Sequence, residues 1–281
     1  MSGRIDFALN HMTAPRLESR ALVDLAVRLG CIGVELRNDL VDKQLTERAF
    51  FDGEQPGAIG AYARSKGIRL LGLSEVYGFN RWSEEMRRKV RLLIDQAKES
   101  GAESISLIPS NDGADMSDDR RLGELRHALQ EILPMLDEAD IVALVEPLGF
   151  RTSSLRRKGE AVEAIEAVGG RHRYKLVHDT FHHFLAEEDA FFPEYTGIVH
   201  ISGVVDPAVS AGEMQDGDRI LVTQEDRLGN VAQISALHAA GYKGAYSYEP
   251  FAPSVHAAPD IEGELRASMK LVEAGIAAAG S

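Results

Sequence analysis

Short apolar segments alternate with longer amphipathic segments along the sequence, and the pair repeats eight times in 281 residues. The short segments are continuous runs rich in Ile, Val and Leu, which is typical of strands covered on both faces. They predict strands at residues 5–9, 32–36, 68–73, 104–108, 141–145, 174–177, 197–201 and 245–248. Regular strand–helix alternation predicts a parallel sheet, because each helix returns the chain to the same end of the sheet.

Helical periodicity fills the intervals between these strands. It predicts helices at residues 18–29, 58–66, 84–100, 119–139, 159–168, 187–192, 230–240 and 261–278. Eight strand–helix units of about 35 residues each favour closure into a barrel, which typically takes ~250 residues. No Gly-x-Gly-x-x-Gly segment follows the first strand, which argues against an open dinucleotide-binding sheet. The sequence therefore predicts an α/β fold, a (β/α)8 TIM barrel, with residues 1–281 in a single domain.

The composition argues against several classes of partner. The net charge of −13 repels phosphate backbones, so nucleic acid is not an expected partner. No run of ~18 apolar residues predicts a membrane span, and the N-terminus lacks the pattern of a secretory signal. A cytoplasmic protein without membrane association is therefore expected. The one cysteine, Cys31, cannot form an intrachain disulfide and is interpreted as a small buried hydrophobe.

Four consecutive predicted strands carry a metal-binding side chain at or near their carboxyl ends. These are Glu146, Asp179, His200 and Glu249. A single glutamate at a strand end is more often a structural hydrogen-bond acceptor, but neighbouring barrel strands lie only ~4.8 Å apart, so four such side chains can converge. Three carboxylates and an imidazole suit one divalent ion, Mn²⁺ or Zn²⁺, with Co²⁺ or Mg²⁺ also compatible. The sequence predicts such a site at the barrel mouth, where barrel enzymes place their chemistry.

Further polar residues are expected around this set. His182 follows Asp179 by three residues and is expected to face the mouth, whereas His178 and His183 are equally well explained as structural histidines. Residues 203–229 form the longest irregular stretch and are interpreted as an active-site loop. Arg219 in this loop could reach a substrate oxygen or could simply be solvated.

Two glutamates and two aromatic residues complete the candidates. Glu75 is expected to end the third strand and Glu35 to lie within the second, and either could accept a hydrogen bond from a substrate hydroxyl. Trp82 and Phe79 could form a wall of the pocket, although core packing is the commoner role of aromatic residues.

These motifs resemble the xylose isomerase-like barrel superfamily, and within it most of all the inosose isomerases, also called 2-keto-myo-inositol isomerases. The resemblance covers most of the chain. It rests on the order of Glu146, Asp179 with His182, His200 and Glu249, and on the segments GVELRND, LGLSEVYGFNRWSEE, HDTFHHF, HISGVVD, MQDGDRI and YSYEPFAPS.

The resemblance implies roles for individual residues. It implies that Glu146, Asp179, His200 and Glu249 bind the metal ion. It further implies that the two glutamates act as catalytic acid and base, and that His182 and Arg219 contact substrate oxygens. One departure leaves the substrate open: relatives often have a Pro-Gly-x-Gly turn after the loop arginine, whereas residues 220–229 here read ILVTQEDRLG.

The favoured reaction moves a carbonyl group to the adjacent carbon of a polyol ring through an enediolate, with one glutamate removing a proton and the other returning one. No glycine-rich phosphate cradle is present, so an unphosphorylated polyol or ketose is the expected partner; a homo-oligomer is left open.

Three rival enzymes and one non-enzyme remain. A ketose 3-epimerase and a dehydratase of inosose or dehydroshikimate type could use the same site. An endonuclease IV-like repair enzyme needs further histidines after strands three and four, where this chain has Leu73-Ser74-Glu75 and Ile108-Pro109-Ser110. A non-catalytic sugar-binding barrel would be distinguished by its metal content.

Overall fold

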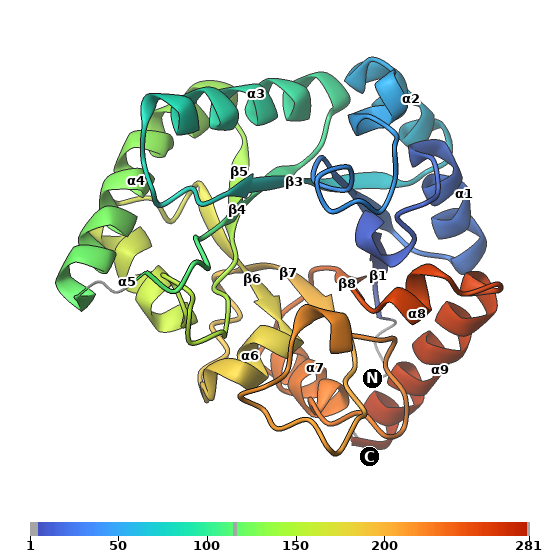
Figure 1. The fold of residues 1–281 in the computed structure, drawn as a ribbon. Coiled ribbons are helices and arrows are strands. Elements are labelled where there is room, and N and C mark those ends of the chain that lie inside the picture. Colours follow the sequence, from blue (N-terminus) through green and yellow to red (C-terminus); the bar gives the residue numbers. More distant parts are fainter. Residues whose placement is uncertain (1–4, 115–116, 280–281) are drawn as a thin grey trace.

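The computed structural model describes residues 5–114 and 117–279, and it contains a closed barrel of eight parallel strands (Figure 1). Each strand pairs with the next in sequence, and β8 returns to pair with β1, with Phe7 opposite Tyr246. The strands are β1 (Phe7–Asn10), β2 (Gly33–Arg37), β3 (Arg69–Tyr77), β4 (Ser104–Ile108), β5 (Val142–Val145), β6 (Tyr174–Asp179), β7 (Thr196–Ile201) and β8 (Tyr246–Tyr248). The predicted (β/α)8 barrel is confirmed.

Helices surround the barrel on its outside (Figure 1). They are α1 (Ser19–Leu29), α2 (Pro56–Ser65), α3 (Glu84–Ser100), α4 (Asp118–Ala139), α5 (Lys158–Ala167), α6 (Thr180–Ala186), α7 (Asn230–Ala239), α8 (Pro253–His256) and α9 (Ile261–Ala279), with short 3-10 helices η1 (His11–Thr13), η2 (Phe50–Gly53) and η3 (Asp216–Asp218). Local signals set their bounds. In α3, for example, Ser83 Oγ accepts a hydrogen bond from the Met86 amide, and Gly101 ends the helix with a φ of 74°.

The helix predicted at residues 187–192 is wrong, because the helix after β6 begins and ends earlier. The Asp179 carboxylate accepts hydrogen bonds from the amides of Phe181 and His182, so α6 begins directly where β6 ends. Glu187 then adopts a left-handed conformation, with a φ of 51°, and ends the helix.

The third strand is longer than predicted and extends to Tyr77. Its pairing with β4 is irregular between Leu73 and Val76, so residues beyond the apolar run remain in the strand. Glu75 therefore lies within β3 and not at its end.

Apolar side chains form the floor beneath the barrel mouth. Val177 and Ile198 lie two residues before Asp179 and His200, on the same faces of their strands, and belong to a small buried cluster. A larger core fills the space between strands and helices and includes Cys31, which is buried as expected.

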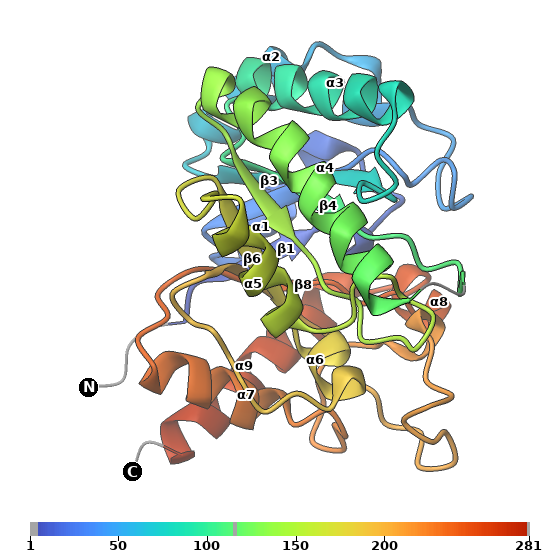
Figure 2. The same ribbon diagram turned by 90° about the vertical axis from the view of Figure 1, so that its left-hand side faces the viewer.

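The described ends of the chain and the long loop after β7 lie at opposite ends of the barrel (Figure 2). In Figure 2 the beginning of β1 and the end of α9 lie on the left, and the long loop after β7, in orange, lies on the right. Arg219 of this loop bonds to Asp179 and Glu249, so the loop reaches the carboxyl end of the strands, where the predicted site residues lie. Among the described residues, no helix is both long enough and apolar enough to cross a membrane.

Candidate metal centre and active site

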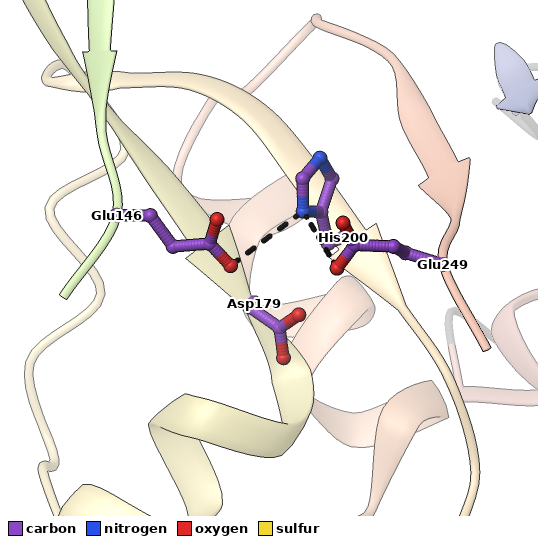
Figure 3. Close-up of side chains that lie close together, drawn as sticks. All are labelled: Glu146, Asp179, His200 and Glu249. Atoms are coloured by element: carbon purple, nitrogen blue, oxygen red, sulfur yellow. Dashed lines mark ion pairs between the residues drawn. The ribbon is translucent and has the colours of Figure 1, made fainter. Parts of the chain in front are cut away.

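The four predicted metal ligands converge at the barrel mouth (Figure 3). Glu146 and Glu249 directly follow β5 and β8, Asp179 is the last residue of β6, and His200 is the penultimate residue of β7. Each residue offers one ligand atom, these atoms all lie within 4.8 Å of one another, and all four side chains are buried. Neighbouring strands thus direct three carboxylates and one imidazole toward a common point, as metal binding requires.

The imidazole of His200 is oriented by a carboxylate behind it. Nε2 lies 3.1 and 3.2 Å from the two Glu35 oxygens, whereas Nδ1 faces Glu249 Oε2 at 3.2 Å. Ser247 Oγ donates a further hydrogen bond to Glu35, at 2.6 Å. Burial lowers the pKa of His200, but Glu249 and Glu35 outweigh burial and raise that pKa well above its usual range, so the ring is positive without an ion. Nε2 keeps its proton for Glu35, and Nδ1 would give up its proton to bind an ion.

This arrangement gives Glu35 a different role from the predicted contact with a substrate hydroxyl. Its side chain is fully buried, and both oxygens already have partners within the barrel. Glu35 instead fixes the orientation of His200, as carboxylates behind metal-binding histidines commonly do.

The two carboxylate oxygens of Asp179 have different hydrogen-bond partners. Oδ1 accepts the amide hydrogen bonds of Phe181 and His182, at 2.7 and 3.0 Å, and so caps α6. Oδ2 accepts a hydrogen bond from Arg219 Nη2 at 2.6 Å. The cap fixes the carboxylate, which leaves Oδ2 directed at the site.

Glu249 is surrounded by positive groups. Arg37 Nη1 lies 2.7 Å from its Oε1, while Arg219 Nη2 lies 3.0 Å from its Oε2. Burial alone would raise the pKa of this carboxyl, but His200 and the two arginines outweigh burial and lower that pKa. Glu249 is therefore held as a carboxylate.

Glu146 has a different environment. Its one ion-pair contact among the described residues is with His200 Nδ1 at 3.7 Å, which is too long for a hydrogen bond. Burial raises the pKa of Glu146, and the nearby charge of Glu249 raises it further. Of the two glutamates, Glu146 is therefore the more basic and the less constrained.

The residues present fit a divalent cation. Nδ1 of His200 is buried and has no hydrogen-bond partner among the described residues, although it lies among carboxylates. A buried polar atom without a partner is costly, and a bound cation would remove that cost while neutralising the carboxylates. The donor set of three carboxylates and one imidazole suits Mn²⁺ or Zn²⁺.

Arg219 lies deeper than the sequence suggested. Its guanidinium is 1% exposed, bonds to Asp179 and Glu249, and lies between the rings of Phe181 and Phe251, 5.1 and 4.5 Å from their centroids. It is therefore not a solvated loop residue. Its contact with a substrate oxygen stays a prediction.

His182 and Glu75 lie near the centre without bonding to it directly. The His182 ring packs against Phe150 and Phe181, and its buried Nδ1 has no hydrogen-bond partner among the described residues. Glu75 accepts a hydrogen bond from Arg37, at 2.9 Å. Burial is the largest cause that raises the pKa of Glu75 to about 7, against the opposing effect of Arg37. Their substrate contacts stay predictions.

The remaining candidates have structural surroundings. Lys158 Nζ donates hydrogen bonds to Nδ1 of His178, at 3.2 Å, and to Nδ1 of His183, at 2.5 Å. These bonds connect α5 with β6 and α6. Phe79 is fully buried in the core, and the Trp82 ring packs partly against that core with Arg87 above it. Neither aromatic residue has a demonstrated role in the site.

Sequence reasoning missed Arg37, the last residue of β2, which is buried and bonds to Glu249 and Glu75. A signal was present: an arginine that continues an apolar strand needs buried acidic partners, and the strand is followed by Asp39.

The barrel and its carboxylate–histidine cluster define a class of protein, that of TIM barrels whose mouth carries side chains that could hold a metal ion. The sequence model of the xylose isomerase-like TIM barrel family matches residues 23–274, and the chain belongs to this family. No curated protein matches the chain.

Several solved structures are similar over almost the whole chain. A xylose isomerase domain containing protein from Salmonella typhimurium LT2 is 30% identical, with a TM-score of 0.85 over 96% of this chain and 97% of that one. The IolI protein, solved with a bound zinc atom, is 18% identical, with a TM-score of 0.80 over 97% and 98%. D-psicose 3-epimerase from Clostridium cellulolyticum H10, solved with D-tagatose, is 15% identical, with a TM-score of 0.72 over 97% and 99%.

Proposed function

We propose that this protein is a metal-dependent isomerase of keto-polyols that interconverts inososes, converting 2-keto-myo-inositol to 1-keto-D-chiro-inositol. The observation that carries the proposal is the pair of glutamates, Glu146 and Glu249, on opposite sides of one cation site that also contains His200. Moving a carbonyl between adjacent carbons needs a group that removes a proton, a group that returns one, and a positive charge near the oxygens.

A divalent ion held by the four ligands would supply that charge and acidify the proton on the carbon that bears the neighbouring hydroxyl. Glu146 is suited to remove this proton, because its carboxylate accepts no hydrogen bond from the described residues and is the less constrained of the two. The electron pair of the broken C–H bond then forms the double bond of an enediolate. Glu249, which starts as a carboxylate, would take the proton of the neighbouring hydroxyl and return it to the former carbonyl carbon. The proton on Glu146 would pass to the other oxygen, so both glutamates end as carboxylates.

Three further side chains are proposed to bind substrate oxygens. His182 offers a ring nitrogen without a partner among the described residues, Arg219 offers a buried guanidinium, and Glu75 offers a carboxylate on a side chain that is 13% exposed. Because the protein has a net charge of −13 and no glycine-rich phosphate cradle, the proposed substrate is a neutral polyol or ketose.

The test is turnover by the purified, metal-loaded protein, followed by NMR of the products. We expect 2-keto-myo-inositol to be converted to its positional isomer faster than any ketohexose is epimerised at C3. Faster epimerisation of a ketohexose would instead favour the second candidate, which the likeness to D-psicose 3-epimerase makes worth testing. Loss of water from the substrate would indicate a dehydratase, and faster turnover of a phosphorylated sugar would contradict the neutral substrate.

Replacing His182 with alanine is expected to lower kcat/KM by about 10²-fold, because an interaction with the reacting oxygens is lost. Metal content should stay close to that of the wild type, since His182 does not lie among the four ligands. Elemental analysis beside steady-state kinetics measures both. His183→Ala, one residue further along α6, is the control and should keep its turnover within a few-fold. Loss of metal together with activity in His182→Ala would show that its role was misassigned.

A further inference from the structure

Arg37 forms a bridge across the barrel mouth that the reaction as described does not use. Its side chain is only 4% exposed, yet its guanidinium makes four short hydrogen bonds to carboxylates. Nε and Nη2 bond side-on to Asp39 at 2.8 and 2.7 Å, Nη1 bonds to Glu249 at 2.7 Å, and Nη2 also bonds to Glu75 at 2.9 Å. A buried arginine is retained at such cost only with well-paired partners.

The pair with Asp39 fixes the plane of the guanidinium. Both members lie at the end of β2, two residues apart, and a side-on pair leaves little rotational freedom. The remaining N–H groups, on Nη1 and Nη2, therefore have directions that the pair with Asp39 fixes, and these N–H groups bond to Glu249 and Glu75. Asp39 thus holds the fork-shaped guanidinium of Arg37 in one orientation.

This fork restricts how Glu249 can bind an ion. Its Oε1 accepts a hydrogen bond from Arg37 Nη1, whereas Oε2 accepts one from Arg219 Nη2 at 3.0 Å and also faces His200 Nδ1 at 3.2 Å. A carboxylate can bind a cation with one oxygen or with both. Because Arg37 holds Oε1 and Oε2 is the oxygen that faces His200, Glu249 would present Oε2 to an ion.

The same fork holds Glu75 beside Glu249. Glu75 bonds to Arg37 through Oε2, and its backbone amide bonds to Asn38 Oδ1 at 2.8 Å. Its side chain is 13% exposed, against 3% for Glu249, and its Oε1 has no hydrogen-bond donor among the described residues. One guanidinium therefore joins a carboxylate that faces the cation site to a carboxylate that faces the opening.

We propose that Arg37 is a positioning residue that keeps Glu249 a one-oxygen ligand and holds Glu75 at a fixed place beside it, ready to accept a hydrogen bond from a substrate hydroxyl. The second part rests on the proposed function, because it assumes a polyol substrate. The first part concerns only the metal centre and can be tested without any substrate.

The test uses Co²⁺ as the probe, bound to the metal-free full-length protein. In Arg37→Met the freed Oε1 can also reach the ion, so the visible absorption of Co²⁺ should weaken, as it does when the coordination number rises. Calorimetric Co²⁺ affinity should be equal to or higher than that of the wild type, because a positive charge beside a ligand has been removed. Turnover of 2-keto-myo-inositol should fall by about 10–100-fold, the usual effect of groups behind metal ligands.

Matched variants separate positioning from general stability. The guanidinium of Arg121 also bonds to a carboxylate, that of Glu160 at 2.6 Å, but on the outside of the barrel. Arg121→Met is therefore the control and should leave the Co²⁺ spectrum unchanged. Arg37→Lys keeps the charge but cannot hold Asp39, Glu75 and Glu249 together, so it should raise KM and lower kcat while remaining folded. If Arg37→Met does not fold, the Co²⁺ spectrum and the kinetics of Arg37→Lys test the proposal in its place.

Two results would overturn the proposal. One is a Co²⁺ spectrum in the Arg37 variants that matches the wild type; the other is a parallel loss of Co²⁺ affinity and turnover, which a merely loosened site would give. Absence of inosose turnover in the wild type would contradict the proposed function, but it would leave the spectroscopic test of Arg37 intact.

Discussion

Removal of the divalent ion is expected to abolish turnover while the barrel stays folded. Without the ion, the substrate carbonyl loses the charge that stabilises an enediolate, and a fall of at least about 10³-fold is expected. The fold should survive because Arg37 and Arg219 already bond to the buried carboxylates of Glu249 and Asp179. Circular dichroism of chelator-treated protein should therefore be close to that of the loaded protein.

The bound ion should still raise the stability of the protein, since it binds the folded state alone. At a free-ion concentration about a thousand times Kd, the free energy of unfolding rises by about 4 kcal/mol, or roughly 8 °C in Tm. Calorimetry of the chelated and reloaded protein measures this, with Ca²⁺ as the control ion. Chelated protein that retains full activity would contradict the metal-dependent mechanism, whereas recovery with Mn²⁺ or Zn²⁺ supports it.

The barrel could be predicted because its signal is repeated eight times in the sequence. A strand covered on both faces is usually apolar on both, so even a short run such as residues 141–145 is visible without knowledge of its neighbours. The candidate metal ligands were visible for the same reason, because Glu146, Asp179 and Glu249 interrupt apolar runs where a charge would otherwise be costly.

What the sequence could not reveal depends on contacts between distant strands. Glu35 lies within an apolar run like the metal ligands, but only the closed barrel shows that it bonds to His200, 165 residues further along the chain. Arg37 likewise meets Glu249 at a separation of 212 residues. The helix predicted at residues 187–192 was wrong because a single side chain, that of Asp179, starts α6 immediately after β6.

The two glutamates should respond differently to replacement by glutamine, although both variants should lose proton transfer. In Glu146→Gln the new amide meets no hydrogen-bond donor among the described residues, since the one ion-pair contact of the present carboxylate, with His200 Nδ1, is 3.7 Å long. The amide oxygen can still face the ion, so metal content should be largely kept. Loss of the base should lower turnover by about 10²–10⁴-fold.

Glu249→Gln has a further defect, because both of its oxygens accept hydrogen bonds from arginines. Arg37 Nη1 and Arg219 Nη2 lie 2.7 and 3.0 Å from Oε1 and Oε2, so an amide NH₂ at either position would face another donor. The side chain should move, and metal content should fall together with turnover. Elemental analysis of the two variants distinguishes this from the behaviour of Glu146→Gln.

Turnover in D₂O, followed by NMR, shows which carboxylate handles the proton. In the wild type, deuterium should enter the ring at the carbon that was the carbonyl, because the proton that Glu249 would return comes from a hydroxyl that exchanges with solvent. In metal-loaded Glu146→Gln, incorporation should collapse although the ion remains bound. Near-normal incorporation in that variant would remove Glu146 as the base. Wild-type turnover without any deuterium would indicate a hydride shift or internal return of the same proton, and in that case the second glutamate would serve only to bind the ion.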